Sequence, residues 1–172
     1  MEISGRCMGR EGDHRRRPRQ YRSVRPLGSG ERSSWSARLN PRFLLDTHIL
    51  VHWLVASRKL SREQLRVLRE AVRRRERLAV SAITLLEIAV LFERGRARSD
   101  VSVATLLSRV ESDPVFQIVP FTVDVASEVA ALGSALRDPS DRAIVCTARI
   151  HKLRLVTSDR RIIDSNLVPV VL

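Results

Sequence analysis

From Pro41 onward, apolar runs of three to six residues alternate with longer segments that carry helical periodicity. The apolar runs predict strands at 43–45, 78–81, 116–121, 153–157 and 167–172. Helices are predicted at 48–55, 61–77, 83–94, 100–112, from 122 or 124 to about 136, and from 138 to about 151. Strands separated by helices need right-handed crossovers, which place the strands parallel in a sheet covered on both faces. The sequence therefore predicts an α/β fold with three layers, α/β/α, around a mainly parallel sheet of about five strands.

Local signals mark the ends of several predicted helices. Ser61 and Gln64 have the spacing of a capping box. Asp138 precedes Pro139, which places a capping side chain before a proline in the first turn. Gly95 is predicted to end the helix at 83–94. In the helix at 61–77, the residues predicted to line the apolar face are Leu65, Leu68 and Val72.

Residues 1–40 differ in composition from the rest of the chain. They hold ten arginines against four acidic residues and contain no run of three apolar residues, so burial cannot offset the entropy lost on ordering. We predict a basic, disordered extension at 1–40 and a single domain at 41–172. Each part carries half of the net charge of +12, a balance that favours a polyanionic partner. An RNA-attracting arm around residues 15–17 is the alternative interpretation of the extension.

Cysteine content and hydropathy indicate a cellular compartment. Cys7 and Cys146 lie far apart and form neither a disulfide framework nor a metal-binding pair, which favours a reducing cytosol. No apolar run approaches the roughly 20 residues of a membrane span. The N-terminus also lacks the apolar middle of a secretory signal. We therefore expect a cytoplasmic protein without a membrane partner.

Four acidic residues follow predicted strands or lie early in the helices after them. Asp46 and Asp159 come directly after strands, Glu87 lies in the helix after the second strand, and Asp141 lies in the first turn of the helix that starts at 138. The carboxyl ends of parallel strands meet at one edge of a sheet, so these side chains are expected to converge. Clustered carboxylates repel by roughly 4 kcal/mol per pair at 4 Å and an effective dielectric constant of 20, so they need bound protons or a cation. All-oxygen ligands select Mg²⁺ or Mn²⁺, which predicts a metal-dependent nuclease.

Each of these acids also has a purely structural interpretation. Asp46 and Asp159 occupy positions where they can cap the next helix. Glu87 can complete a capping box with Thr84, and Asp141 can favour a helix dipole. Glu87 fits its structural interpretation least, because apolar residues flank it on both sides and an isolated buried carboxylate is very costly.

Three segments follow one another in the chain: LLDTHILVHWL, SAITLLEIAVLFERGR and RDPSDRAIVCTARIHKLRLVTSD. In this order they resemble the PIN-domain family, and more narrowly the VapC-type ribonuclease toxins of bacterial toxin–antitoxin pairs. The resemblance covers about residues 41–172. It implies RNA hydrolysis with Mg²⁺ or Mn²⁺, a cognate antitoxin as partner, and a homodimer. It places the acids of the family, which serve as both metal ligands and catalytic residues, on Asp46, Glu87, Asp141 and Asp159.

The expected roles of these acids differ. Asp46 and Asp141 are expected to be the main metal ligands, and Glu87 to share the metal or orient the attacking water. Asp159 is expected to complete the site through a water molecule or a second ion. Asp138 is expected to act first as a helix cap. Hydroxyl groups that can orient the carboxylates or water belong to Thr47, Ser81 and Thr157.

Surface residues supply candidate contacts to RNA and to the antitoxin. The basic candidates are Arg142, Arg160, Arg66, Arg69 and Arg73, of which the last three also fit an ordinary solvated helix face. Apolar candidates for an antitoxin groove, which equally fit the core, are Leu86, Val90, Leu91, Leu106 and Leu107. An RNA target would be read where it is unpaired, because a duplex hides its base edges.

Other functions fit the pattern less well. A phosphatase of the haloacid dehalogenase type has a second Asp two residues after its nucleophile, where this chain has His48. A receiver domain needs a different pattern of acids and lysine. His48 and His52 have the spacing of a zinc pair, but no third ligand accompanies them. The alternative from another class is a non-catalytic nucleic-acid-binding module, which would bind without divalent ions and cleave nothing.

Overall fold

The structure is a computed structural model that describes residues 41–94 and 101–172. Several predictions fall outside these residues and stay predictions. They concern the extension at 1–40 with its arginine arm and Cys7, and the helix stop at Gly95.

The described residues form five strands and seven helices. The strands are β1 (Phe43–Leu45), β2 (Leu78–Ser81), β3 (Phe116–Val119), β4 (Arg154–Val156) and β5 (Val170–Val171). The helices are α2 (Thr47–Leu54), α3 (Arg62–Arg74), α4 (Ala82–Glu93), α5 (Val103–Ser112), α6 (Val123–Ala131), α7 (Pro139–Ile150) and α8 (Arg160–Ser165). The predicted alternation of strands and helices is therefore confirmed.

The strands form one sheet in the order β3-β2-β1-β4-β5, and every neighbouring pair is parallel. At the centre, Leu45 at the end of β1 pairs with Val80 of β2 and Val156 of β4. The predicted five-stranded, mainly parallel sheet is confirmed, and its described strands are all parallel. The carboxyl ends of β1, β2 and β4 consequently meet at one edge, from which the chain continues into α2, α4 and α8.

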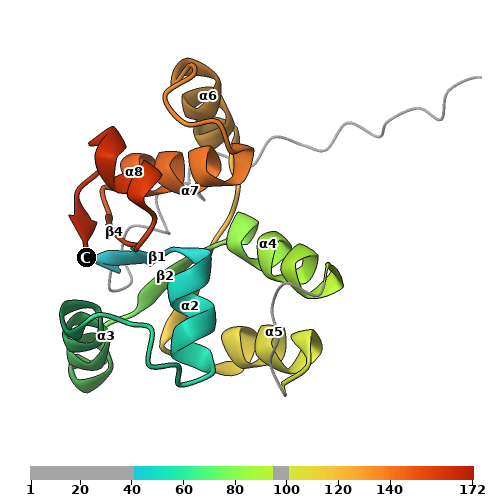
Figure 1. Ribbon diagram of the computed structural model, residues 1–172, viewed down its shortest axis with the longest axis vertical. Helices are drawn as coiled ribbons and strands as arrows, with labels where there is room; N and C mark the ends of the chain where they lie inside the picture. The colour runs from blue at the N-terminus through green and yellow to red at the C-terminus, as the bar shows by residue number, and fades with distance from the viewer. Residues whose placement is uncertain (1–40, 95–100) are drawn as a thin grey trace, which may run out of the picture. The chain divides into compact units, whose positions relative to one another are not determined.

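Alternate strand residues face two separate hydrophobic cores. Leu45 packs with the fully buried Leu50 of α2 and Leu68 of α3 in one core. Leu44 packs with Ile144 of α7 and Ile162 of α8 in the other. Figure 1 shows the sheet between α6, α7 and α8 on one side and α2, α3 and α5 on the other. The predicted three-layer arrangement is confirmed.

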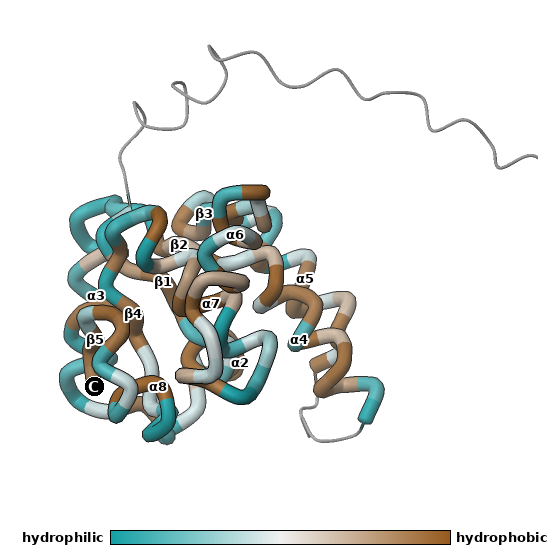
Figure 2. The backbone as a smooth tube through the Cα atoms, turned by 90° about the horizontal axis from the view of Figure 1, so that it is seen from above, coloured by the Kyte–Doolittle hydropathy of each residue, from teal (hydrophilic) through white to brown (hydrophobic). Residues whose placement is uncertain are grey.

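Helix α4 differs from its neighbours because it is apolar along most of its length, as Figure 2 shows in brown. It contacts α2 and α5 from one layer and α7 from the other. Only Thr84 and Ile88 of this helix are fully buried. Within the described residues, no helix has both the length and the apolar character needed to cross a membrane.

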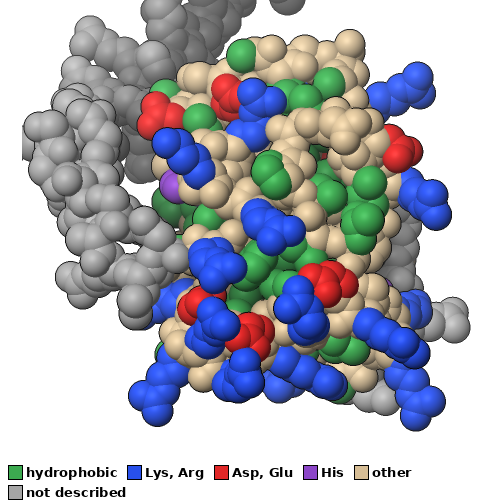
Figure 3. Space-filling view, turned by 90° about the vertical axis from the view of Figure 1, so that its left-hand side faces the viewer, with side chains coloured by type: hydrophobic (Ala, Val, Ile, Leu, Met, Phe, Trp, Pro, Cys, Tyr) green, Lys and Arg blue, Asp and Glu red, His purple; other side chains and the backbone are tan. Residues whose placement is uncertain are grey.

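Helix α3 confirms the predicted capping box but differs in its buried face. Ser61 accepts a hydrogen bond from the Gln64 backbone, and the Gln64 side chain accepts one from the Ser61 backbone. Val72, predicted to face the core, is 46% exposed, while Val67 and Ala71 are buried beside Leu68. The outer face carries ion pairs within the helix: Arg66–Glu63, Arg73–Glu70 and Arg74–Glu70. Figure 3 shows arginine or lysine and acidic side chains interspersed over this part of the surface.

Several element ends also differ from the predictions. Helix α6 ends at Ala131 rather than near 136, because Gly133 adopts a left-handed φ of 66° that a helix cannot contain. Helix α3 ends at Arg74, where Arg75 takes the same region with a φ of 57°. Helix α5 begins only at Val103, after the N-cap Ser102. Helix α8 was not among the predicted elements.

Candidate active site

Asp46 lies at the centre of the carboxyl edge of the sheet, directly after β1. Its backbone N–H still donates to the Val156 carbonyl at 3.1 Å, so the residue extends the pairing of β1 with β4. It occupies the N-cap position of α2, but its side chain makes no capping hydrogen bond. Instead, Asp46 Oδ2 accepts a hydrogen bond from Thr157 Oγ1 at 2.6 Å. The structural interpretation as a cap is therefore wrong, and the carboxylate faces the edge of the sheet.

Burial dominates the electrostatics of Asp46. The residue is only 4% exposed, and loss of solvation raises the pKa of its carboxyl. The hydrogen bond from Thr157 and the nearby His48 oppose this increase, whereas Asp159 adds to it. The charged form of Asp46 is thus disfavoured unless a positive charge approaches.

Glu87 faces the same edge from the second turn of α4. The cap of α4 is Ser81, whose hydroxyl accepts from the Ile83 N–H at 3.3 Å, so Glu87 forms no capping box with Thr84. The Thr47 hydroxyl donates a hydrogen bond to Glu87 Oε2. Burial raises the pKa of Glu87, and the charges of Asp46 and Asp138 raise it further. Thr47 therefore ties a helix acid to the start of α2, next to Asp46.

Helix α7 supplies the third acid. Asp138 caps this helix by accepting from the N–H groups of Ser140 at 2.8 Å and Asp141 at 3.4 Å, as predicted. The Asp141 side chain does not cap the helix, and it is 13% exposed. Burial, followed by the charge of Asp138, raises the pKa of Asp141 to about 6. The nearby Asp159 and Asp46 contribute in the same direction.

Asp159, the fourth acid, pairs closely with the guanidinium of Arg161. Its Oδ1 caps α8 by accepting from the Arg161 N–H at 2.8 Å. The Arg161 guanidinium donates from Nε to Oδ1 at 3.1 Å and from Nη2 to Oδ2 at 2.6 Å. These contacts lower the pKa of Asp159. Nη2 of Arg161 also lies 3.2 Å from Asp141 Oδ2, so this one side chain bridges two acids.

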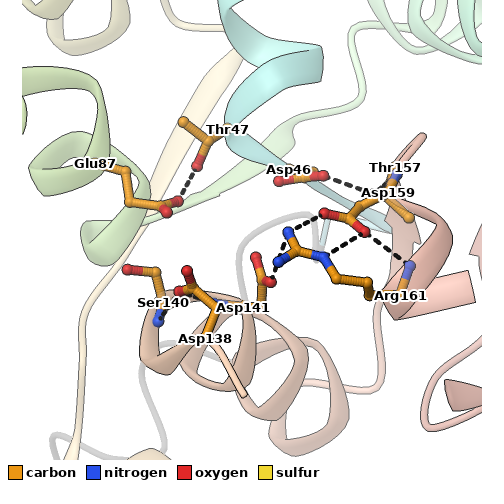
Figure 4. Close-up of polar contacts among 9 residues, drawn as sticks. All are labelled: Asp46, Thr47, Glu87, Asp138, Ser140, Asp141, Thr157, Asp159 and Arg161. Carbon is orange, nitrogen blue, oxygen red and sulfur yellow. Dashed lines mark hydrogen bonds and ion pairs between the residues drawn. The ribbon is translucent and has the colours of Figure 1, made fainter. Parts of the chain in front are cut away.

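The structure brings the four predicted acids to one edge of the sheet (Figure 4). We call them the carboxylate cluster: Asp46, Glu87, Asp141 and Asp159. Their oxygen donors are the type that Mg²⁺ and Mn²⁺ prefer, and their mutual repulsion is what a bound cation relieves. Across residues 41–94 and 101–172, no three His, Cys, Asp or Glu side chains are already arranged to hold a metal ion. The residue types and charges fit a divalent ion, and the positive charge that the chain itself supplies is Arg161.

The supporting residues were predicted in part. Thr47 and Thr157 hydrogen bond to carboxylates as expected, whereas Ser81 caps α4 instead. Sequence reasoning missed Ser140, whose nearby side chain lowers the pKa of Glu87. It also missed the second role of Gln64, whose Nε2 donates to the Thr157 carbonyl at 3.1 Å and to Ser158 Oγ at 2.9 Å. No local pattern signals this long-range contact.

The arginine at the cluster is not one of the two predicted from the sequence. Arg142 is turned toward α6, where its Nη2 donates to the Val129 carbonyl at 2.6 Å. Arg160 is exposed. Arg161 takes the position beside the acids. Its place in the sequence could have indicated this, because a helix N-cap residue, here Asp159, lies close to the residue two positions later.

The fold and site define a class of protein: an all-parallel α/β/α domain with carboxylates converging at the carboxyl edge of its central strands. Residues 43–165 match the PIN domain, and this chain belongs to the PIN-domain family. Ribonuclease VapC22 of Mycobacterium tuberculosis is 35% identical over 120 residues, which cover 69% of this chain and 88% of that protein. The predicted family is therefore confirmed.

Solved structures share the fold. VapBC2 from Rickettsia felis, bound to a DNA fragment from its promoter, has a TM-score of 0.56 at 16% identity, covering 74% of this chain and 96% of that one. FitAcB from Neisseria gonorrhoeae has a TM-score of 0.55 at 24% identity, covering 74% and 95%. At these identities the likeness concerns the fold alone.

Proposed function

We propose that this protein is a metal-dependent endoribonuclease that acts as the toxin of a toxin–antitoxin pair. The observation that carries the proposal is the carboxylate cluster at the central edge of the sheet. Burial and mutual repulsion raise the pKa of three of its members, as expected of a site that receives a cation. Membership of the PIN-domain family and the relation to a ribonuclease at 35% identity support the choice of RNA.

In the proposed mechanism, Asp46 and Asp141 would hold Mg²⁺ or Mn²⁺, and Asp159 would complete the site. The ion supplies charge neutralisation at the phosphodiester and lowers the pKa of water. Thr157 holds Asp46 in place through its 2.6 Å hydrogen bond, and Thr47 holds Glu87. Glu87 then accepts a hydrogen bond from the attacking water and orients it toward phosphorus. Hydrolysis breaks the P–O bond to the leaving strand.

The decisive experiment is an RNA cleavage assay with Mn²⁺ or Mg²⁺ on the purified Asp46→Asn protein. We expect cleavage to be abolished, because the substitution removes a charged oxygen ligand at the centre of the cluster. The matched control is Asp113→Asn. Asp113 lies before β3 at the opposite edge of the sheet, and its side chain accepts a hydrogen bond from the Val115 N–H. This variant should cleave like the wild type.

A second measurement on Asp46→Asn separates loss of chemistry from loss of fold. In the absence of metal, the variant should melt at a higher temperature than the wild type, because it removes a buried charge that its neighbours repel. Unchanged cleavage by Asp46→Asn would end the active-site assignment. Divalent-independent RNA binding without cleavage by the wild type would favour the alternative, a non-catalytic nucleic-acid-binding module.

The proposed partners are an RNA substrate and a cognate antitoxin, both in the cytoplasm. Two solved structures that share the fold, from Rickettsia felis and Salmonella typhimurium, are DNA-bound VapBC assemblies. On this chain, Leu86 of α4 is 60% exposed, and Val90 and Leu91 are half-buried, which leaves apolar surface for a partner. Leu106, one of the residues considered for this groove, is fully buried in the core and is excluded from it. Formation of a homodimer stays a prediction.

A further inference from the structure

One cationic side chain lies among the acids of the carboxylate cluster. The Arg161 guanidinium contacts Asp159 through Nε at 3.1 Å and Nη2 at 2.6 Å, and the same Nη2 lies 3.2 Å from Asp141 Oδ2. Figure 4 shows it between these two carboxylates, on the side away from Glu87. Arg161 thus forms a bridge between α7 and α8 at the cluster.

The oxygen atoms in this bridge are those that a metal ion needs. Asp141 Oδ2 and Asp159 Oδ2 both lie within ion-pair distance of Nη2, at 3.2 Å and 2.6 Å. A divalent cation bound to the same oxygens would bring its charge within a few ångströms of the guanidinium, and two cations at that distance repel each other. Metal binding and the Arg161 bridge therefore compete for one set of ligands.

The bridge can open without disturbing the fold. The Arg161 side chain is 65% exposed, so its departure leaves no cavity. The cap of α8 does not depend on it, because Asp159 Oδ1 accepts from the backbone N–H of residue 161 independently of the guanidinium. Arg142 lacks this freedom, since its guanidinium is tied to the Val129 carbonyl.

We propose that Arg161 is a displaceable counterion of the carboxylate cluster: it neutralises Asp141 and Asp159 in the metal-free protein, leaves them when the metal binds, and then contacts the phosphate backbone of the RNA. This inference rests on the proposed function. It makes Arg161 a positioning residue that couples metal binding to substrate binding. A planar guanidinium suits both tasks, since it pairs bidentately with carboxylates and with phosphates.

The first test is Mn²⁺ binding by isothermal titration calorimetry to the full chain after chelator treatment, without RNA. The variants are Arg161→Gln and the matched control Arg160→Gln, which removes the same charge from the adjacent exposed residue. We expect Arg161→Gln to bind Mn²⁺ about three- to tenfold more tightly than Arg160→Gln, because no guanidinium then competes with Mn²⁺ for the carboxylates. The expected gain is small because exposed ion pairs are weak. Equal or weaker Mn²⁺ binding by Arg161→Gln would overturn the displacement.

The second test measures RNA binding. In a Glu87→Gln background, which removes the carboxylate proposed to orient the attacking water and keeps Asp46, Asp141 and Asp159, a fluorescently labelled single-stranded RNA is titrated with protein in Mn²⁺. Adding Arg161→Gln should weaken binding at least threefold relative to adding Arg77→Gln, which removes the same charge from an exposed residue directly before β2, at the opposite edge of the sheet. Equal affinities would overturn the phosphate contact.

The metal-free melting temperature keeps this inference separate from the proposed function. Without metal, Arg161→Gln should melt at a lower temperature than Arg160→Gln, since two carboxylates lose their counterion. If the wild type binds no Mn²⁺ at all, the proposed function fails, and the metal-free comparison still decides the role of Arg161. Equal melting temperatures would contradict that role.

Discussion

At the scale of the residue, the four acids occupy two electrostatic environments. Asp46, Glu87 and Asp141 have their pKa raised by burial, whereas Arg161 lowers the pKa of Asp159. Proteins place perturbed groups of this kind at functional sites, where stability is given up for chemistry. The metal-free cluster therefore destabilises the fold whenever its buried members are charged.

The raised pKa of the buried acids predicts how the stability of the metal-free protein depends on pH. The pKa of Asp141 is about 6 in the folded chain against an ordinary value of 3.8. The folded state binds this proton more tightly, so the carboxyl has no destabilising effect below pH 4, and its cost grows as the pH rises to 6 and then stays constant. We expect metal-free wild type to lose up to roughly 3 kcal/mol relative to Asp141→Asn across this window.

Urea unfolding from pH 4 to pH 7.5 in a chelator measures that difference. Asp113→Asn serves as the control, because the Asp113 side chain lies at the far edge of the sheet, where it accepts a hydrogen bond from the Val115 N–H. Its stability should follow that of the wild type. A constant difference between Asp141→Asn and wild type over the whole range would contradict the prediction.

The acids could be located from the sequence, but the arginine beside them could not. The positions of Asp46 and Asp159 follow from the rule that parallel strands end at one edge. Arg142, Arg160 and Arg161 look equivalent in sequence, because each lies one or two residues from an acid. What separates them is the packing of α6 against α7, which draws Arg142 away, and the cap of α8, which turns Arg161 back onto Asp159.

At the scale of the element, short pieces were the hardest to predict. Helix α8 spans six residues, too few to show helical periodicity, and it ends where Asn166 adopts a left-handed φ of 53°. In α3 the predicted face was rotated, since Gln64 is fully buried while Val72 is 46% exposed. Tertiary hydrogen bonds make that possible, and these are not written in the local pattern.

The Gln64 side chain links α3 to the segment that carries Asp159. Its Nε2 holds the Thr157 carbonyl and Ser158, while its Oε1 accepts from the Ser61 N–H. Gln64→Leu should destabilise the protein by about 2–4 kcal/mol, because it strips partners from buried polar groups. Ser61→Ala removes the hydroxyl that caps α3 and also its exposed hydrogen bond to the Leu172 carbonyl, and should cost about 1 kcal/mol.

Both values are measured as free energies of unfolding in urea. Equal losses for the two variants would show that Gln64 acts only as a cap. A larger loss for Gln64→Leu supports its contact with the turn after β4.

At the scale of the whole molecule, the described residues of both hydrophobic cores run from Phe43 to Val171, and the strand residues among them pack with helices of the same range. The composition of residues 1–40 predicts that they add nothing to burial. The boundary near residue 40 nevertheless stays a prediction.

Deleting residues 1–38 tests it. We expect the shortened chain to melt cooperatively and within a few degrees of the full chain, while its net charge falls by half, to roughly +6. Circular dichroism during heating measures the transition. Loss of cooperative melting would refute the exclusion of this segment from the domain.

The backbone pairing of Asp46 has one more consequence, for hydrogen exchange. The Asp46 N–H bonds to the Val156 carbonyl inside the central strand pair, and the Thr157 N–H bonds to the Val171 carbonyl. Amides of this kind exchange with solvent mainly when the sheet opens, whereas a six-residue helix such as α8, in which Ile162 alone is fully buried, opens more readily. The backbone amides on the two sides of the carboxylate cluster should thus exchange at different rates. The Asp46 amide should exchange as slowly as the sheet opens, and the amides of α8 next to Asp159 should exchange faster, through local opening.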